Sequence, residues 1–149
     1  MPDLQRADTL SIHYRVDDFT GPWADAPILL LQHGNGRSGR FWYRWVPLLA
    51  RHFRIVRPDI RGLGDSTRPA DLEASLTLDN LVSDLVALLD HLGADRVHYC
   101  GESMGGILGL ALAALYPDRI RTLTLVGTPV FIEQQMKDRY SLGHGSRTE

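Results

Sequence analysis

Apolar residues along this chain follow two spacings, one typical of strands and one typical of helices. Leu10–Val16 alternates apolar and polar residues, which predicts an antiparallel strand at the edge of a sheet. Residues 27–32 form a continuous apolar run, which predicts a strand buried on both faces. Apolar residues recur at helical spacing through 78–92, with Thr77 placed to cap that helix and Gly93 to end it.

The same two patterns predict the remaining elements. We expect strands over 53–57, 96–100 and 120–126, and helices over 40–51 and 106–116. Strands and helices alternate three times, an order that implies right-handed crossovers. The sequence therefore predicts an α/β fold with a mostly parallel, doubly wound sheet covered by helices on both faces. The helix over 40–51 carries aromatic residues that we expect in the core, with the wall of an apolar pocket as the alternative: Phe41, Trp42 and Trp45.

Composition narrows the class of protein. The chain has 149 residues, enough for one domain, and its formal net charge of −2 gives no reason to expect nucleic acid or an anionic membrane as a partner. No apolar run reaches the roughly 18 residues of a membrane-spanning helix, and Met1–Arg6 has no signal-peptide character. Cys100 is the sole cysteine, and we expect it to be a packing residue of a cytoplasmic protein. The six histidines lack zinc-ligand spacing, so we expect no metal.

The segment Gly101–Gly105 reads G-x-S-x-G between a predicted strand and a predicted helix. In that context the pattern is typical of a nucleophile elbow, with Ser103 as the nucleophile. The tight turn crowds its own backbone, which explains why Gly101 and Gly105, without a Cβ, flank the serine. The alternative is a serine that merely caps the following helix.

A second glycine-containing loop follows the strand over 27–32. Gly34 and Gly36 let its backbone approach a ligand closely. Acyl transfer needs hydrogen-bond donors where negative charge develops on the carbonyl oxygen. The carboxyl ends of parallel strands share one sheet edge, so the backbone N–H groups of Asn35 and Met104 could meet there. We expect His33 to brace this loop rather than to act as the general base.

The same loop also fits a different class of protein. Gly34–Gly39 is formally G-x-G-x-x-G, and Asp59 comes twenty residues after Gly39, which is the spacing of a dinucleotide-binding fingerprint. Bulky residues directly after Gly39 argue against this alternative, because helix and strand would need close contact there. It also leaves the serine motif unexplained.

A third pattern, Asp59–Ser66, lies after the strand over 53–57. We interpret it as a structural turn in which Gly62 and Gly64 supply positive φ and the polar side chains satisfy the backbone. A loop that borders the active site is the alternative.

Together these segments resemble a known family. H-G-x-G at His33–Gly36, D-x-R-G-x-G-x-S at Asp59–Ser66 and G-x-S-x-G-G at Gly101–Gly106 are similar, in order and spacing, to motifs of the α/β-hydrolase fold family. The resemblance covers Leu10 to Pro129. It is greatest to the small bacterial esterases, the enol-lactone hydrolases and the hydrolases of carbon–carbon bonds.

The resemblance implies roles for individual residues. Ser103 would be the nucleophile, and Asn35 and Met104 would supply the oxyanion N–H groups. Residues 1–129 would form the N-terminal part of the hydrolase core. Residues 130–149, with a helix expected over 130–139, would begin the cap that covers such sites.

The chain departs from the family in one respect. The family orders its triad as serine, acid and histidine, but Gly127–Pro129 holds no carboxylate. We interpret Glu133 as a surface residue and His144 as part of a mobile loop, and assign neither to the triad. We therefore expect the N-terminal portion of a longer enzyme of roughly 250 residues or more. A cut near Gly143–Glu149 would leave the C-terminal portion bound as a separate chain.

These inferences predict a serine hydrolase that acts on a small carboxylic ester or lactone, without a cofactor. Alone, the chain should be nearly inactive, because removal of a triad's base costs several orders of magnitude in rate. Three alternatives stay open: a carbon–carbon bond hydrolase of the same fold, a non-catalytic binding protein of that fold, and a dinucleotide-binding protein.

Overall fold

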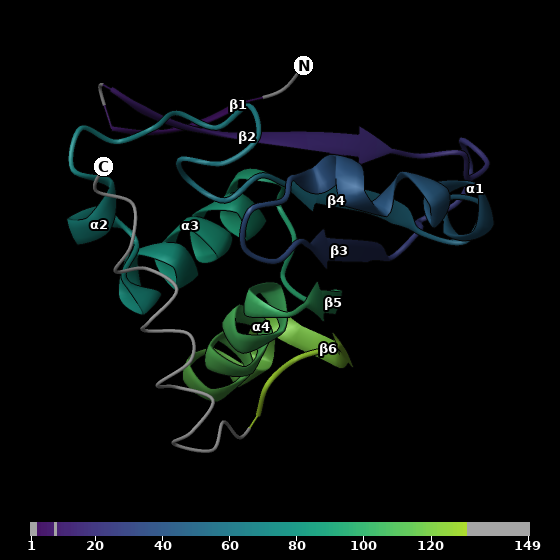
Figure 1. Ribbon diagram of the computed structural model, residues 1–149. Coiled ribbons are helices and arrows are strands. Elements are labelled where there is room, and N and C mark those ends of the chain that lie inside the picture. The colour runs from purple at the N-terminus through teal and green to yellow at the C-terminus, as the bar shows by residue number, and fades with distance from the viewer. Residues whose placement is uncertain (1–2, 8, 131–149) are drawn as a thin grey trace.

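The computed structural model describes residues 3–7 and 9–130. Their strands form one six-stranded sheet with the order β1-β2-β4-β3-β5-β6 (Figure 1). The strands β3 to β6 are parallel, and β1 and β2 are antiparallel to their neighbours. This is the predicted mostly parallel sheet. The strands are β1 (Asp3–Ala7), β2 (Leu10–Asp17), β3 (Ile28–Gln32), β4 (Arg54–Pro58), β5 (Val97–Glu102) and β6 (Ile120–Val126).

Helical segments connect the parallel strands. They are the 3₁₀ helices η1 (Gly39–Arg44) and η2 (Pro117–Arg119), and the α-helices α1 (Val46–Leu49), α2 (Leu72–Ser75), α3 (Leu78–His91) and α4 (Met104–Leu115). The predicted ends of α3 are confirmed: the Thr77 hydroxyl accepts a hydrogen bond from the Asn80 N–H, and Gly93, just past the helix, has φ of +64°.

Both faces of the sheet are covered, as the continuous apolar run over 27–32 predicts. Successive residues of β3 enter two different cores. Leu30 packs into the core that α3 and α4 share with the sheet. Leu29 and Leu31 pack into the core under η1 and α1, where Trp42 is fully buried and Cys100 is a packing residue. Trp42 is thus a core residue, whereas Phe41 and Trp45 lie beside its ring and are partly exposed.

The strand predicted over Leu10–Val16 exists, but its place at the sheet edge is wrong. The strand β1 pairs with β2 on the outside, with Leu4 opposite Ile12. Only five residues long, β1 carries Arg6, which binds Asp84 of α3. A short, polar strand of this kind has a weak sequence signal, because its place depends on contacts with distant residues.

The helix predicted over 40–51 is also corrected. The structure has the 3₁₀ helix η1 and then the single turn α1, with Trp45 between them. Pro47 explains the break, because it has no N–H to donate to the carbonyl four residues earlier.

The edge of the sheet formed by β6 is more exposed than the central strands of the sheet. Within the described residues β6 pairs with β5 alone, and most of its side chains are exposed or half-buried. Leu125, an apolar residue of β6, is 38% exposed. The segment predicted as a cap lies outside the described residues beyond Val130, as do Glu133 and His144. No helix among the described residues is long and apolar enough to cross a membrane.

Candidate active site

Ser103 sits between β5 and α4 in a backbone conformation that serine rarely adopts. Its φ is +52° and its ψ is −117°, and among the described residues it is the one non-glycine residue with positive φ. Such strain costs on the order of 1–3 kcal/mol and persists only where the surroundings enforce it. The Ser103 side chain makes no capping hydrogen bond to α4, which contradicts the alternative of a simple helix cap. The hydroxyl is therefore held out on a sharp turn, without a local structural partner.

Two hydrogen bonds hold this turn in place, and it requires a glycine at position 101. The Ser103 N–H donates to the Val126 carbonyl of β6 at 3.0 Å, and the Tyr99 hydroxyl donates to the Gly105 carbonyl at 2.7 Å. A Cβ on Gly101 would collide with the Gly105 carbonyl group. The two glycines that flank Ser103 thus allow a turn that any larger residue would open.

The loop after β3 lies directly against this turn. A Cβ on Gly105 would meet the carbonyl oxygens of Gln32 and His33, and a Cβ on Gly34 would lie 2.9 Å from the Ser103 Cβ. The structure therefore brings the two predicted segments together, although 68 residues separate Gly34 from Glu102.

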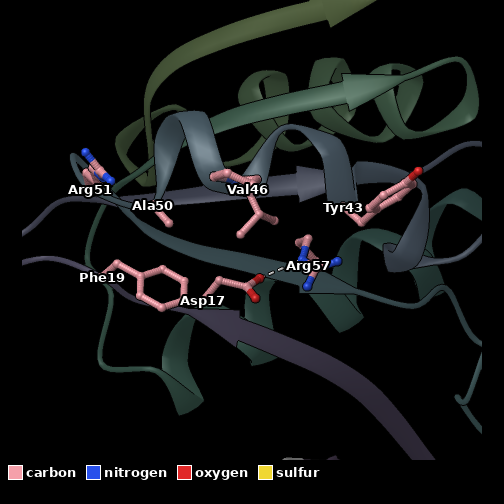
Figure 2. Close-up of a pocket in the computed structure, with 8 residues that line it drawn as sticks. Asp17, Phe19, Tyr43, Val46, Ala50, Arg51 and Arg57 are labelled. Carbon is pink, nitrogen blue, oxygen red and sulfur yellow. Dashed lines mark hydrogen bonds and ion pairs between the residues drawn. The ribbon is translucent and has the colours of Figure 1, made fainter.

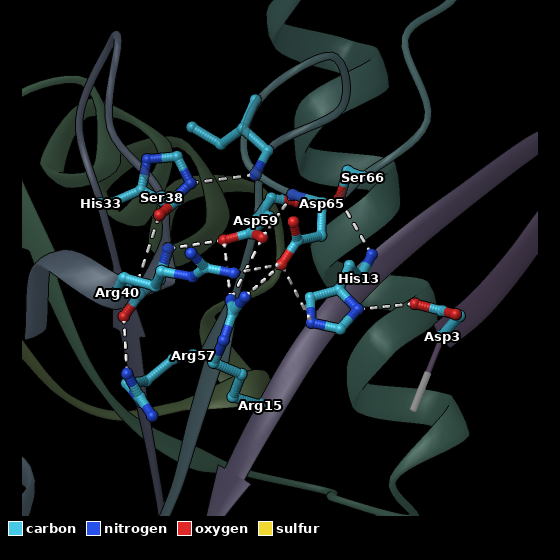
Figure 3. A network of polar contacts seen from close by, with 12 residues as sticks. Asp3, His13, Arg15, His33, Ser38, Arg40, Arg57, Asp59, Asp65 and Ser66 are labelled. Carbon is cyan, nitrogen blue, oxygen red and sulfur yellow. Dashed lines mark hydrogen bonds and ion pairs between the residues drawn. The ribbon is translucent and has the colours of Figure 1, made fainter. Parts of the chain in front are cut away.

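His33 braces this loop from inside the protein. It is fully buried, and its Nε2 accepts a hydrogen bond from the Ile60 N–H at 3.1 Å (Figure 3). Its Nδ1 lies 2.8 Å from the Gly34 carbonyl oxygen. Because Nε2 accepts, Nδ1 carries the proton and donates to Gly34. Burial lowers the pKa of His33, partly opposed by the bond to Gly34 and by the Asp59 and Glu102 carboxylates. With both ring nitrogens occupied, His33 has no free position from which to accept a proton from Ser103.

The backbone donors of the predicted oxyanion hole lie on these two segments. The Gly34 carbonyl that His33 holds belongs to the same peptide group as the Asn35 N–H, so His33 also orients that N–H. Gly36 follows with φ of +68°. Among the described residues, neither the Asn35 N–H nor the Met104 N–H donates to a protein acceptor. Both remain available to a bound oxygen atom.

In the turn after β4, a buried carboxylate is hydrogen-bonded to groups within the protein (Figure 3). The fully buried Asp59 carboxylate accepts the N–H groups of Gly39 at 2.5 Å and Asp65 at 2.9 Å, and Arg15 donates to it as well. Burial raises the pKa of Asp59, but these hydrogen bonds together outweigh burial and hold it below its usual value. Gly62 and Gly64 have φ of +76° and +58°, as the structural interpretation of this segment predicts.

Asp59 also bears on the dinucleotide alternative. That alternative needs an exposed carboxylate that can bind a ribose. The Asp59 carboxylate is instead buried and saturated with internal donors, and the loop of Gly34–Gly39 leads into a 3₁₀ helix. The structure disfavours a dinucleotide site here.

A cluster of His13, Asp59 and Asp65 has the composition of a metal site. The Arg15 guanidinium, however, donates to both carboxylates. Arg15 supplies the positive charge that a metal ion would bring, so the cluster is explained as an internal ion-pair network.

A cavity of about 640 Å³ is a different feature from the Ser103 turn. Figure 2 shows it between α1 and the end of β2, with Phe19 on one side and Val46 and Ala50 on the other. Arg57 at its base is paired with Asp17 at 2.7 Å. Among the described residues, its lining includes no serine, cysteine or histidine.

Sequence reasoning missed several charged residues near the site. The Glu102 carboxylate binds the loop after β3, where Arg37 pairs with it. A buried ion pair joins Arg61 to Asp84 of α3 at 2.8 Å. Glu102 could have been singled out by its position next to the serine, and Asp84 by its place on the apolar face of the helix.

Known proteins share this architecture. The α/β hydrolase fold family matches residues 27–146. The chain belongs to the α/β-hydrolase fold family. It is 40% identical over 103 residues to RutD of Pseudomonas syringae pv. syringae, which is provisionally named a carbamate hydrolase. Over 107 residues it is 38% identical to the 2-hydroxy-6-oxo-2,4-heptadienoate hydrolase of Pseudomonas putida.

Solved structures agree with this membership. A hydrolase from Pseudomonas aeruginosa superposes with a TM-score of 0.81 at 34% identity, over 98% of this chain and 53% of the other. The enol-lactonase from Burkholderia xenovorans gives a TM-score of 0.76 at 35% identity, over 85% of this chain and 46% of the other. The chain spans about two fifths of the length of the two curated relatives, with 69% and 70% of this chain aligned and 39% and 38% of theirs.

Proposed function

We propose that this chain carries the nucleophile and the oxyanion donors of a serine hydrolase that acts on a small carboxylic ester or lactone. The strained backbone of Ser103 supports this proposal most directly, because the fold maintains a costly conformation in which the hydroxyl has no hydrogen-bond partner among residues 3–7 and 9–130. The enol-lactonase among the similar structures supports the substrate class.

In the proposed reaction, the Ser103 oxygen attacks the substrate carbonyl carbon while a general base takes the hydroxyl proton. The carbonyl oxygen becomes an oxyanion that accepts the N–H groups of Asn35 and Met104. The intermediate collapses, the C–O bond to the leaving alcohol breaks, and the base returns its proton to that alcohol. Water, activated by the same base, then hydrolyses the acyl-serine ester and releases the acid.

The base and the acid of the triad are not among the described residues. No histidine or carboxylate in residues 3–7 and 9–130 hydrogen-bonds to the Ser103 hydroxyl, and His33 is engaged on both nitrogens. We propose that further polypeptide supplies both groups, as a continuation or as a separate bound chain. Support comes from β6, whose outer edge is unpaired within the described part of the chain, and from the partial coverage of the relatives.

Covalent labelling tests the nucleophile. A fluorophosphonate should add its phosphonyl group to the intact protein, and peptide mass spectrometry should place it on Ser103. The Ser103→Ala variant should not be labelled, whereas a control variant of exposed Ser83 should be labelled like the parent. Labelling that persists in Ser103→Ala would refute the assignment, and a correctly folded protein that neither reacts nor hydrolyses esters would favour the non-catalytic alternative.

A hydrolase of carbon–carbon bonds is the second candidate. The relative from Pseudomonas putida is named for a substrate of that kind, and the same serine, loop and donors could serve it. Parallel assays with a vinylogous 1,5-diketone acid and with simple esters and lactones would separate the two. The ratio of kcat/KM values would identify the substrate class.

A further inference from the structure

Glu102 occupies the variable position directly before Ser103, where a carboxylate has a specific contact. It is the last residue of β5, and its side chain is 16% exposed. Its Oε2 accepts the Gly34 backbone N–H at 3.0 Å. The residue next to the nucleophile therefore binds the loop that carries the oxyanion donor.

Gly34 fits tightly between this carboxylate and the nucleophile. A Cβ on Gly34 would lie 2.5 Å from the Glu102 Oε2 and 2.9 Å from the Ser103 Cβ, so a side chain there would displace both groups. The Gly34 N–H is held by Glu102, and the Gly34 carbonyl is held by His33. Both peptide groups around Gly34 are thus fixed, and the second of them contains the Asn35 N–H.

A carboxylate beside an oxyanion hole also has an electrostatic cost. Its negative charge disfavours the negative charge that develops on the substrate oxygen. Arg37 lies in a position to offset this effect, since its Nε is 3.4 Å from the Glu102 Oε2. The guanidinium also stacks over the Phe41 ring, with 4.3 Å between its central carbon and the ring centroid.

We propose that Glu102 and Arg37 form a charge-balanced clasp that positions the oxyanion loop against the nucleophile. In this clasp Glu102 holds the Gly34 N–H, and Arg37 neutralises the carboxylate. Both are positioning residues, and their effect on catalysis rests on the proposed hydrolase function.

The clasp predicts a pattern of rates that simple loss of packing would not produce. In the full-length protein, Glu102→Ala should lower kcat about tenfold with little change in KM, because the Asn35 donor loses its position. Arg37→Met should lower kcat about threefold to tenfold, since the carboxylate is then unbalanced. Combining Glu102→Gln with Arg37→Met should restore kcat to within about threefold of the parent, since the amide oxygen still accepts from Gly34 and no net charge remains.

Matched variants control for charge and folding. Glu73→Gln and Arg68→Met make the same charge changes at exposed positions and should leave kcat unchanged. If the double variant that combines Glu102→Gln with Arg37→Met is no faster than Arg37→Met alone, the charge-balancing role is wrong. If Glu102→Ala matches the parent in kcat, the positioning role is wrong.

Hydrogen exchange at the Gly34 amide tests the clasp without reference to catalysis. Exchange should accelerate at least tenfold in Glu102→Ala and stay near the parent rate in Glu102→Gln. Equal exchange in the parent and in Glu102→Ala would overturn the clasp itself. A different result is slow exchange at the Gly34 amide of the parent but no fluorophosphonate labelling of Ser103. That result would overturn the proposed hydrolase function, and with it the catalytic role of the clasp.

Discussion

Two glycine-containing turns follow β4 and β5, the parallel strands on either side of β3. They differ in whether their polar groups have hydrogen-bond partners. At the turn of Asp59–Ser66 the polar side chains have internal partners: the Asp59 carboxylate accepts two backbone N–H groups and Arg15, and the Ser66 hydroxyl donates to the Asp59 carbonyl. At the turn around Ser103 the backbone is strained and the hydroxyl is free of protein partners among the described residues.

The difference distinguishes a structural turn from a candidate active site, although both have similar composition. In the structural turn the polar side chains are hydrogen-bonded and the positive φ values fall on glycines, which adopt them without strain. A functional turn retains strain and an unpaired reactive group, whose stability is supplied by surrounding contacts. Substitutions at the first should therefore reduce stability, and substitutions at the second should reduce activity.

The largest effect is expected at the hydroxyl of Ser103. Ser103→Ala should lower kcat/KM at least about 10³-fold, because the proposed acyl-enzyme could no longer form. Its free energy of unfolding should stay within about 0.5 kcal/mol of the parent. Ester hydrolysis and urea denaturation measure the two quantities. A variant that keeps its activity would remove the contrast between the turns.

The next largest effect should be a loss of stability at Asp59. Asp59→Ala leaves Arg15, whose side chain is 11% exposed, without its buried partner and two N–H groups without an acceptor, so unfolding should become easier by about 3 kcal/mol. Asp90→Ala removes an ion pair from a carboxylate that is 62% exposed and should cost less than about 1 kcal/mol. Urea denaturation at neutral pH would compare them. Equal losses would mean that burial of the Asp59 network contributes nothing.

The pKa of Asp59 predicts a pH dependence for the same network. Because the pKa is lower in the folded protein than its usual value of 3.8, the stabilisation is complete above that value and is lost as pH falls below it. Asp59→Asn should therefore flatten the loss of stability in acid, which urea denaturation repeated across that pH range would measure.

A smaller effect of opposite sign is expected for Ser103→Gly. Glycine adopts positive φ without the steric cost of a Cβ, so this variant should gain about 1 kcal/mol in unfolding free energy while losing activity. Ser103→Ala keeps the Cβ and should show no such gain, which makes it the matched control. If neither variant is stabilised, the turn around Ser103 is not strained in solution.

The smallest effect concerns His33. Burial lowers its pKa below the usual 6.5, so the unfolded chain binds a proton that the folded protein does not. Stability should fall as pH drops from 7.5 to 6, with His33 contributing at most about 0.8 kcal/mol. His33→Asn should lose this part of the pH dependence, whereas His52→Gln, at an exposed position, should leave the curve unchanged. Identical pH curves for the parent and His33→Asn would show that His33 titrates normally.

The sequence predicted most of the architecture because the relevant signals are local. The buried run over 27–32, the helical period over 78–92 and the G-x-S-x-G turn each lie within one element, and the structure contains β3, α3 and the turn at Ser103. The break at Pro47 was missed, although proline gives a local reason for it.

Interactions between distant segments could not be predicted from local patterns in the sequence. No local pattern over Asp3–Ala7 predicts the strand β1, because this strand depends on pairing with β2 and on the hydrogen bond from Arg6 to Asp84. Likewise, no local pattern joins Glu102 to Gly34, because the fold alone brings these residues side by side.

By itself, the sequence determined the order of strands and helices, the position of the serine turn and the glycines that permit it, because period and backbone sterics act over a few residues. Only the tertiary structure decided which polar groups are saturated and which stay free. That outcome depends on which segments meet at the sheet edge, since a hydrogen bond needs its partner within about 3 Å. The contrast between Asp59 and Ser103 is of this second kind.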